Sequence, residues 1–579
     1  MKILLVAVDA KYIHTNLAVH SLKAYSNKFG KHISIAQYSI NHSEDQILRG
    51  IYLENPDVVA FSCYIWNISM ISSIIKSLKK IKPQVKIWFG GPEVSYYPKE
   101  GLLKYKDLDG IVVGEGEQTF YELMEYYLGK GKELEDICGI AFKDRARLNN
   151  THIKTDDKVY VTPRRMPISL DEIPFAYDGI ENYKNKIIYY ESSRGCPYSC
   201  SYCLSSAHKG VKFRSIDLVK KELKIFLDND VPQVKFVDRT FNCNRGHAME
   251  IWQFIKDNDN GKTNFHFEIT ADLLSEEELS LLESLRPGLV QFEIGVQTTN
   301  PDTEKAIQRK VDFSILADKV RRINKADNIH QHLDLIAGLP LEDYDSFEKS
   351  FQDVYQLKPH QLQLGFLKVL KGSLIEEEIN KYGIVYNDEP PYEVLYTKHL
   401  SYNEIIELKG ICDMVEVYYN SGQFTYSLEY IGHYFTSPMK LYSSLYHYYL
   451  SKDIYGLAQS RIKRYDILLD FFKTHVDSDM THVFKEILLF DLCLREGIRK
   501  RPDYIGPPIP YQKYREICEA LNIDKPNRTK IHLERLNYDV IETAKSGMPI
   551  KKECIVMFDY GNRDPLTNSA KIEFYDDAR

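Results

Sequence analysis

The sequence predicts an α/β protein with a doubly wound, mostly parallel N-terminal sheet, a central partial (β/α)6 barrel and a mixed, mostly helical C-terminal domain. Two observations carry this prediction. Short apolar runs alternate with helical stretches over residues 1–143, and the same alternation returns over residues 186–390. Strands that alternate with helices imply right-handed crossovers and parallel pairing. Past about residue 390 the alternation gives way to a tyrosine-rich helical region.

The composition is that of a large globular protein and limits the possible partners. The 579 residues suffice for three to four domain-sized units. Because 82 acidic residues outnumber 75 basic ones, we expect no nucleic-acid partner. No stretch reaches the ~18 apolar residues of a membrane span, and Asp9, Lys11 and His14 interrupt the N-terminal apolar run. Ten cysteines are too sparse for a secreted disulfide framework, so we expect a cytoplasmic protein without a membrane segment.

The first domain, residues 1–143, is predicted to bind a ligand at one edge of its sheet. Its strands are the runs "ILLVAV", "ISIAQY", "VVAFSCY", "KIWFGG", "GIVVGEGE" and "ICGIAF". Residues 9–16, 62–67, 90–93 and 114–117 each follow a strand. Open α/β sheets bind ligands at the carboxyl ends of their strands, so these four loops are expected to form one pocket floor.

Residues 144–185 are predicted to be an extended linker, because they are polar and rich in proline. The barrel strands follow it in the runs "KIIYYESS", "QVKFVDRT", "NFHFEITAD", "LVQFEIGVQ", "HQHLDLIAGLP" and "HQLQLGFLKVL". Residues 391–579 form the third domain, in which "CIVMFDY" and "AKIEFY" predict a terminal hairpin. We expect this domain to cover the barrel mouth and to shape a substrate pocket.

Cys196, Cys200 and Cys203 form a CxxxCxxC motif directly after the first barrel strand. Three cysteines at fixed spacing favour a metal site, and Gly195 and Pro197 suit a loop that turns around an inorganic core. A zinc site completed by His208 is the alternative. Zinc ligands usually come as two separated pairs, however, and a 4Fe-4S cluster normally takes four thiolates. Three protein ligands would leave one iron open.

The motif and its place in the chain resemble the radical S-adenosylmethionine (SAM) superfamily over about residues 185–400. The resemblance implies that SAM binds the fourth iron of a 4Fe-4S cluster. It assigns SAM contacts to Tyr202, Glu268, Gln297, Arg309, Asp334 and Gly338, which stand in "CSYC", "FEI", "EIGVQTTNPDTEKAIQR" and "DLIAGLP". The residue types agree with this ligand, because a guanidinium can grip a carboxylate and carboxylate or amide oxygens can accept from ribose hydroxyls.

The first domain resembles the cobalamin-binding domain that precedes the barrel in one radical SAM subgroup. Ser62 follows a strand, a Gly-Gly pair comes 28 positions later, and "VVGEGE" follows the next strand. The resemblance implies that cobalamin contacts Ser62, Tyr64, Trp66, Asn67, Gly90, Gly91, Glu93, Gly114 and Glu115. A flavodoxin-like or purely structural sheet is the alternative.

One departure concerns the lower face of the cobalt. The Asp-x-His-x-x-Gly motif that supplies a cobalt ligand is absent, and His14 in "DAKYIHTNL" does not fit it. We therefore expect no histidine ligand. The loop of residues 63–67 would lie under the corrin ring, where a bulky residue would exclude water.

Together the resemblances imply a cobalamin-dependent radical SAM enzyme that methylates an unactivated carbon of a small-molecule or peptide substrate. A 5'-deoxyadenosyl radical would remove a hydrogen atom, and methylcobalamin would supply the methyl group. The cofactors carry that chemistry, and a reducing partner such as flavodoxin or ferredoxin is implied. A rearrangement or cyclisation without methyl transfer and a non-catalytic iron-sulfur or corrin sensor remain as alternatives. A methylthiotransferase would need three cysteines in the first domain, which has only Cys63 and Cys138.

Overall fold

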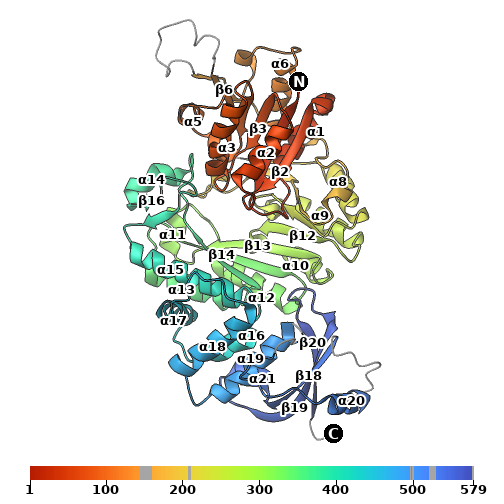
Figure 1. Ribbon diagram of the computed structural model, residues 1–579, viewed down its shortest axis with the longest axis vertical. Helices are drawn as coiled ribbons and strands as arrows, with labels where there is room; N and C mark the ends of the chain where they lie inside the picture. The colour runs from red at the N-terminus through yellow and green to blue at the C-terminus, as the bar shows by residue number, and fades with distance from the viewer. Residues whose placement is uncertain (144–158, 207–209, 496, 498–500, 521–529, 577–579) are drawn as a thin grey trace. The chain divides into compact units, whose positions relative to one another are not determined.

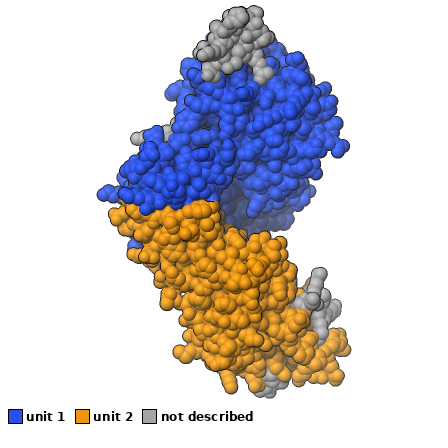
Figure 2. Space-filling model, turned by 60° about the vertical axis from the view of Figure 1, so that its left-hand side comes forward, with its two compact units in different colours: residues 1–293, 304–316, 366–398 blue, residues 294–303, 317–365, 399–579 orange. Residues whose placement is uncertain are grey.

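The structure is a computed structural model that describes residues 1–143, 159–206, 210–495, 497, 501–520 and 530–576. The chain divides into two compact units (Figure 2). The first unit comprises residues 1–293, 304–316 and 366–398, and the second comprises residues 294–303, 317–365 and 399–579. Among the described residues, no helix has the length and apolar character that crossing a bilayer requires.

The first unit begins with a seven-stranded sheet in the order β2-β1-β3-β4-β5-β6-β7. Strands β1 to β5 are parallel, which confirms the predicted arrangement. The strands are β1 (Ile3–Asp9), β2 (Ile33–Ser39), β3 (Val58–Ser62), β4 (Lys86–Gly90), β5 (Gly110–Val112), β6 (Ile140–Lys143) and β7 (Val159–Val161). Strands β6 and β7 are antiparallel additions. The chain enters β6 at the carboxyl end of β5, where Val113 donates to the carbonyl of Gly139, so β6 has to run backwards.

Helices cover both faces of this sheet (Figure 1). One core joins Leu4, Val6 and Val8 to α2, α3 and α5, and the other joins Ile3, Leu5 and Ala7 to α1 and α6. These helices are α1 (Leu17–Tyr25), α2 (Glu44–Leu53), α3 (Ile68–Ile81), α5 (Pro98–Lys104) and α6 (Glu117–Tyr127), with the short α4 (Pro92–Ser95) between strands. Helix α3 buries Ile68, Ile71, Ile74, Ile75 and Leu78, the spacing of an amphipathic helix.

A six-stranded sheet in the order β15-β14-β13-β12-β11-β8 confirms the second series of βα units. Its strands are β8 (Ile187–Tyr190), β11 (Gln233–Phe236), β12 (Asn264–Ile269), β13 (Val290–Gln297), β14 (His330–Ala337) and β15 (Gln361–Phe366). The helices of this series are α8 (Ile216–Asp228), α9 (Arg245–Asp257), α10 (Glu276–Glu283), α11 (Pro301–Ala306), α12 (Phe313–Ala326), α13 (Tyr344–Tyr355) and α14 (Leu374–Tyr382). Strands β16 (Val385–Tyr386) and β17 (Val394–Tyr396) form a short pair after it.

The C-terminal part of the second unit is mixed, as predicted, with helices followed by an antiparallel sheet. Its helices are α15 (Tyr402–Met414), α16 (Thr425–Gly432), α17 (Pro438–Ser451), α18 (Arg461–His475), α19 (Thr481–Arg495), α20 (Tyr511–Ala520) and α21 (Val540–Ser546). The predicted terminal hairpin is β19 (Lys551–Arg563) with β20 (Ala570–Asp576). The sequence reading missed the third strand, β18 (Ile531–Tyr538), which pairs with β19.

Candidate cofactor-binding site

The three cysteines of the CxxxCxxC motif lie on one loop of the first unit. Cys196 ends the strand β9 (Ser193–Cys196), which pairs with β10 (Gly210–Phe213). A side chain at Gly195 would place its Cβ 2.2 Å from the carbonyl oxygen of Gly210, and the φ of Gly195 is +108°. Only glycine fits such a position. The zinc alternative depends on His208, which lies outside the described residues.

Arg309 lies beside this loop, close to one of its thiols. Its Nη1 is 3.9 Å from the Sγ of Cys200 and 3.4 Å from the hydroxyl of Tyr202. Burial raises the pKa of the Cys200 thiol, and Arg309 acts in the opposite direction. The structure thus brings together one cysteine and two of the residues predicted to contact SAM. A guanidinium here suits a site that must hold thiolates and the carboxylate of a ligand.

The base of the cysteine loop is tied to Asp238, which follows β11. Asp238 is fully buried and accepts hydrogen bonds from the backbone N–H of Ser192 at 2.9 Å and from the hydroxyls of Ser192 and Ser193 at 2.6 Å. Burial raises its pKa to about 7, although these hydrogen bonds act to lower it. Sequence reading missed this anchor, since only the fold brings "FVDRT" next to "ESSRG".

Glu268 on β12 lies in the first unit, as do Tyr202 and Arg309, whereas the predicted SAM contacts Gln297, Asp334 and Gly338 lie in the second unit. Gln297 ends β13 with a φ of +74°, which is unusual for a side chain other than glycine. Its Oε1 is buried without a hydrogen-bond partner among the described residues, as expected of an atom that awaits a ligand. Asp334 on β14 contacts Nε2 of His332 at 2.9 Å, and Gly338 follows that strand with a φ of +84°.

At the carboxyl edge of the first sheet, the backbones of two neighbouring loops lie very close together. Gly91 has a φ of +110°, and a Cβ there would lie 2.5 Å from the carbonyl oxygen of Cys63. Asn67 is fully buried and orders the same loop, because it donates to the carbonyls of Ser62 and Val8 at 2.9 and 3.0 Å and accepts from the N–H of Tyr64 at 2.8 Å. These contacts fix the backbone on which the predicted cobalamin residues stand.

Tyr64 and Trp66 form an aromatic platform on this edge. Their rings stack with centroids 4.3 Å apart and planes inclined by 7°. Trp66 remains 44% exposed, and its Nε1 donates to the carbonyl of Val8. A partly exposed aromatic surface fits the bulky, water-excluding residue that we predicted below a corrin ring.

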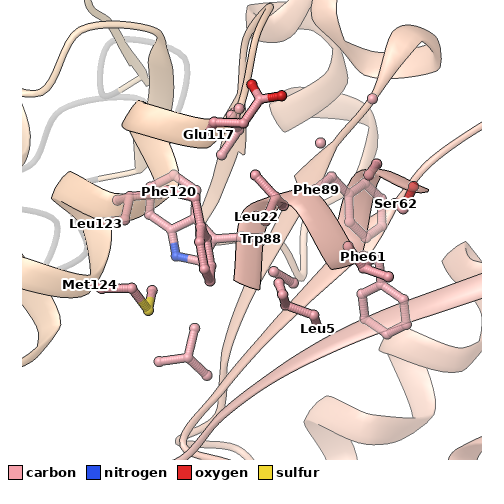
Figure 3. Close-up of a pocket in the computed structure, with 18 of the residues that line it drawn as sticks. Leu5, Leu22, Phe61, Ser62, Trp88, Phe89, Glu117, Phe120, Leu123 and Met124 are labelled. Carbon is pink, nitrogen blue, oxygen red and sulfur yellow. The ribbon is translucent and has the colours of Figure 1, made fainter. Parts of the chain in front are cut away.

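A cavity of about 140 Å³ opens between this edge and helices α1 and α6. Figure 3 shows Leu5, Trp88 and Phe120 among the side chains around it. Its lining also includes the predicted cobalamin residues Ser62, Tyr64, Gly90, Gly91 and Gly114. An apolar slot with aromatic walls fits a flat, bulky group such as the tail of cobalamin.

Glu93 and Glu115, also predicted to contact cobalamin, take part in ion pairs with later segments of the first unit. Glu93 is buried, lies 2.7 Å from Nζ of Lys371 and accepts a hydrogen bond from Tyr392. Glu115 is 2.6 Å from Nζ of Lys212 and 3.2 Å from Nη1 of Arg194. Local sequence patterns do not predict these partners, because each pair joins segments far apart in the chain.

Arg194 joins the cysteine loop to the glycine-rich loop of the first domain. Its Nη2 is 2.7 Å from Glu117 and 2.7 Å from Glu191. Burial acts to raise the pKa of Glu117, but the charge and the hydrogen bonds of Arg194 together hold that pKa below its usual range. The "SRGC" and "GEGE" motifs are therefore in direct contact.

One further cluster in the described residues has metal-ligand composition. Ligand atoms of Cys493, His532 and Glu534 lie within 4.8 Å of one another. Arg501 occupies both oxygens of Glu534, at 2.5 and 2.8 Å. A bidentate guanidinium satisfies that carboxylate and repels a cation, so we assign no metal to this cluster.

Three family models match the chain. The B12 binding domain matches residues 3–124, and the Radical SAM superfamily matches residues 190–354. The chain carries a B12-binding domain followed by a radical SAM domain. Residues 380–558 match a protein family of unknown function, DUF4080. The resemblances drawn from the cysteine loop and from the Gly-Gly pair are thereby confirmed.

Curated relatives and solved structures agree with this domain organisation. The cobalamin-dependent radical SAM methyltransferase TokK of Streptomyces tokunonensis is 26% identical over 57% of this chain and 50% of that protein. The uncharacterized methyltransferase PH0819 of Pyrococcus horikoshii is 28% identical over 45% of this chain and 59% of that protein. The chain thus spans about half the length of these relatives. The cobalamin-dependent radical enzyme OxsB, solved with aqua-cobalamin and SAM, has the same fold, with a TM-score of 0.56 and 16% identity over 94% of this chain and 83% of that chain.

Proposed function

We propose that this protein is a cobalamin-dependent radical SAM methyltransferase that methylates an unactivated carbon of a small-molecule or peptide substrate. One observation carries the proposal. Arg194, two positions before the first cysteine of the motif, is ion-paired with Glu117, the first residue of α6, which lines the apolar cavity. This contact supports a single site that uses both halves of the first unit.

The residues for each cofactor follow from the site. Cys196, Cys200 and Cys203 would hold a 4Fe-4S cluster, and Tyr202, Glu268, Gln297, Arg309, Asp334 and Gly338 would contact SAM. The edge from Ser62 to Glu115 and the cavity behind it would hold cobalamin. When bound, these groups supply radical hydrogen abstraction and a methyl group.

The chain's own residues position the cofactors and exclude water. Arg309 lies beside the thiol of Cys200 and would place its positive charge next to the carboxylate of SAM. The Tyr64 and Trp66 stack would shield a bound corrin from solvent. A one-electron donor such as flavodoxin or ferredoxin would reduce the cluster.

Selective removal of one cofactor tests the proposal. Anaerobically reconstituted wild-type protein should contain about four irons and show a corrin absorption band. Cys200→Ala should lose the iron and all SAM cleavage while it keeps the corrin band, because the cavity lies in another domain. Cys138→Ala is the matched control and should behave as wild type.

Methyl-labelled SAM separates the proposal from its nearest rival. Label in a product supports methyl transfer, whereas turnover to an unlabelled product would favour a rearrangement or cyclisation. Zinc in place of iron, or a reduced protein that never cleaves SAM, would contradict the proposal altogether.

A further inference from the structure

The barrel strands of the first unit have one apolar and one polar face. Val234, Phe236, Phe265, Phe267 and Phe292 are fully buried on one face, where Phe267 and Phe292 contact Trp252 of helix α9. The opposite face carries Tyr189, Lys235, His266, Glu268 and Glu293, since successive side chains of a strand point to opposite sides. The helices cover the apolar face, so the polar residues face the interior of the barrel.

Four of these residues lie side by side and are called the polar layer here: Tyr189, Lys235, His266 and Glu293. Tyr189 pairs with Lys235 across β8 and β11, and Lys235 pairs with His266 across β11 and β12. Nζ of Lys235 and Nε2 of His266 lie 2.7 and 3.1 Å from the same oxygen, Oε2 of Glu293. Three ionisable groups and a phenol therefore meet at one level of the barrel.

The polar layer keeps its charges despite being largely enclosed. Burial alone would raise the pKa of Glu293, but the hydrogen bond from His266 and the charge of Lys235 hold it well below its usual range. Replacing such a pair by apolar residues is often neutral or stabilising. Retained charge in an enclosed position is therefore a sign of function. Glu293 opens the "EIGVQ" motif, but none of the four residues is among those predicted to hold the cluster, SAM or cobalamin.

Part of the layer's hydrogen-bonding capacity is unused. Oε1 of Glu293 and two of the three N–H groups of Lys235 have no partner within the described part of the chain. The layer thus offers an acceptor and a donor next to each other. A ligand that matches it must carry a donor and an acceptor of its own.

The layer also lies next to the first domain's ligand edge. Nδ1 of His14, from the loop after β1, is 2.7 Å from the hydroxyl of Tyr189. Burial raises the pKa of Tyr189 to about 12, and the charges of Asp9, Glu293 and Glu268 contribute. The loop after β1 and Glu268, a predicted SAM contact, therefore lie close to the layer.

We propose that the polar layer binds the substrate of this enzyme through a group that both donates and accepts hydrogen bonds, such as an amide or the zwitterionic head of an amino acid. Lys235 donates to that group and Glu293 accepts from it, while His266 and Tyr189 hold these two in place. The substrate is then a water-soluble compound and not a hydrocarbon. The assignment rests on the proposed function, because it concerns the substrate of that reaction.

Ligand capture by the full-length, cluster-loaded protein tests the assignment. The protein is dialysed anaerobically with SAM against the water-soluble small-molecule fraction of a cell extract, and the retained compounds are identified by mass spectrometry. We expect wild-type protein to enrich an amide or amino-acid compound. Lys235→Met/Glu293→Gln, which removes both charges together, should bind that compound about 10- to 100-fold more weakly and retain SAM unchanged.

Controls distinguish binding from folding. Lys220→Met/Glu250→Gln removes an ion pair on the outer surface of the same domain and should capture the compound as wild type does. If the double variant fails to fold, Glu293→Gln alone, which preserves shape, should still weaken capture about tenfold.

Several outcomes would overturn the assignment. In the first, wild-type protein enriches only solvent-extractable compounds or no compound at all. In the second, the folded double variant binds the compound with wild-type affinity. Loss of thermal stability without loss of capture would make the layer a structural ion pair. Formation of 5'-deoxyadenosine by reduced wild-type protein is scored separately, because its absence contradicts the proposed function and leaves the captured compound as evidence for the layer.

Discussion

The two parallel sheets of this protein expose different parts of their strands to ligands. All seven residues of β1 in the first sheet are buried, because helices cover both faces. In β13 of the second sheet, buried and partly exposed residues alternate along all eight positions. A sheet covered on both faces can bind a ligand only through the loops at its strand ends, whereas a barrel strand can point a side chain at a ligand from every second position.

This difference explains how each candidate site is made. The first domain uses backbone shape, with Gly91 packed against Cys63 and an apolar cavity behind them. The barrel uses charged side chains, with Arg309 beside Cys200 and the polar layer on the strands. The first arrangement suits a large, mostly apolar cofactor, and the second suits small polar ligands.

Aspartate substitutions at adjacent strand positions test this difference between the two sheets. Of the changes considered, they should have the largest effects on stability. Val6 and Ala7 face opposite sides of β1, and both are fully buried, so Val6→Asp and Ala7→Asp should each destabilise the protein by about 4 kcal/mol or more. On β13, Phe292→Asp should have the same effect, but Gln291→Asp should cost less than about 1 kcal/mol. Thermal unfolding and soluble yield measure these effects. A tolerated Ala7→Asp would show that one face of the first sheet is open after all.

Arg194 is where the two kinds of site meet, and its removal should have the next largest effect. Arg194→Met leaves Glu117 and Glu191 without their cation in a half-buried position, which we expect to cost about 3 kcal/mol. Hydrogen exchange of peptides covering residues 113–118 and 187–196 should accelerate together. Arg245→Met, which breaks an exposed ion pair with Glu277, is the matched control and should change stability by less than about 0.5 kcal/mol. Faster exchange in only one of the two peptides would mean that Arg194 does not couple the loops.

The sequence predicted the parts of this molecule that depend on local patterns. Apolar periodicity predicted both parallel sheets, and the spacing of Cys196, Cys200 and Cys203 predicted the kind of site. These patterns did not predict the direction of β6 or the existence of β18, because both depend on how a segment pairs with distant residues.

Contacts between distant segments could not be predicted from the sequence either. Glu93 and Glu115 stand in glycine-rich motifs, and nothing local indicates that Lys371 and Lys212 pair with them. Only part of the polar layer could be predicted from the sequence. The alternation in "VKF", "FHFE" and "FEIG" is visible in the sequence, but the strand register that aligns Lys235 with His266 is not.

Asp238 and Glu117 flank the same cysteine loop, and their contributions to stability should change with pH in opposite directions. This is the smallest of the expected effects. The folded-state pKa of Asp238 is raised to about 7 by burial, so its contribution to stability is complete below its unfolded pKa and is lost as pH rises toward 7. The pKa of Glu117 is lowered, so its contribution persists at high pH and is lost only on acidification.

Asp238→Asn should therefore be less stable than wild type at pH 5 and should recover on the order of 2 kcal/mol relative to wild type by pH 8. Hydrogen exchange of residues 187–196, corrected for the intrinsic effect of pH, measures the difference. Glu117→Gln is the companion variant, and its deficit relative to wild type should stay constant between pH 6 and 8, since Glu117 remains charged throughout. If the Asp238→Asn difference stays equally constant, Asp238 is already ionised at pH 5, and the anchor of the cysteine loop is held by a charge and not by a neutral carboxyl group.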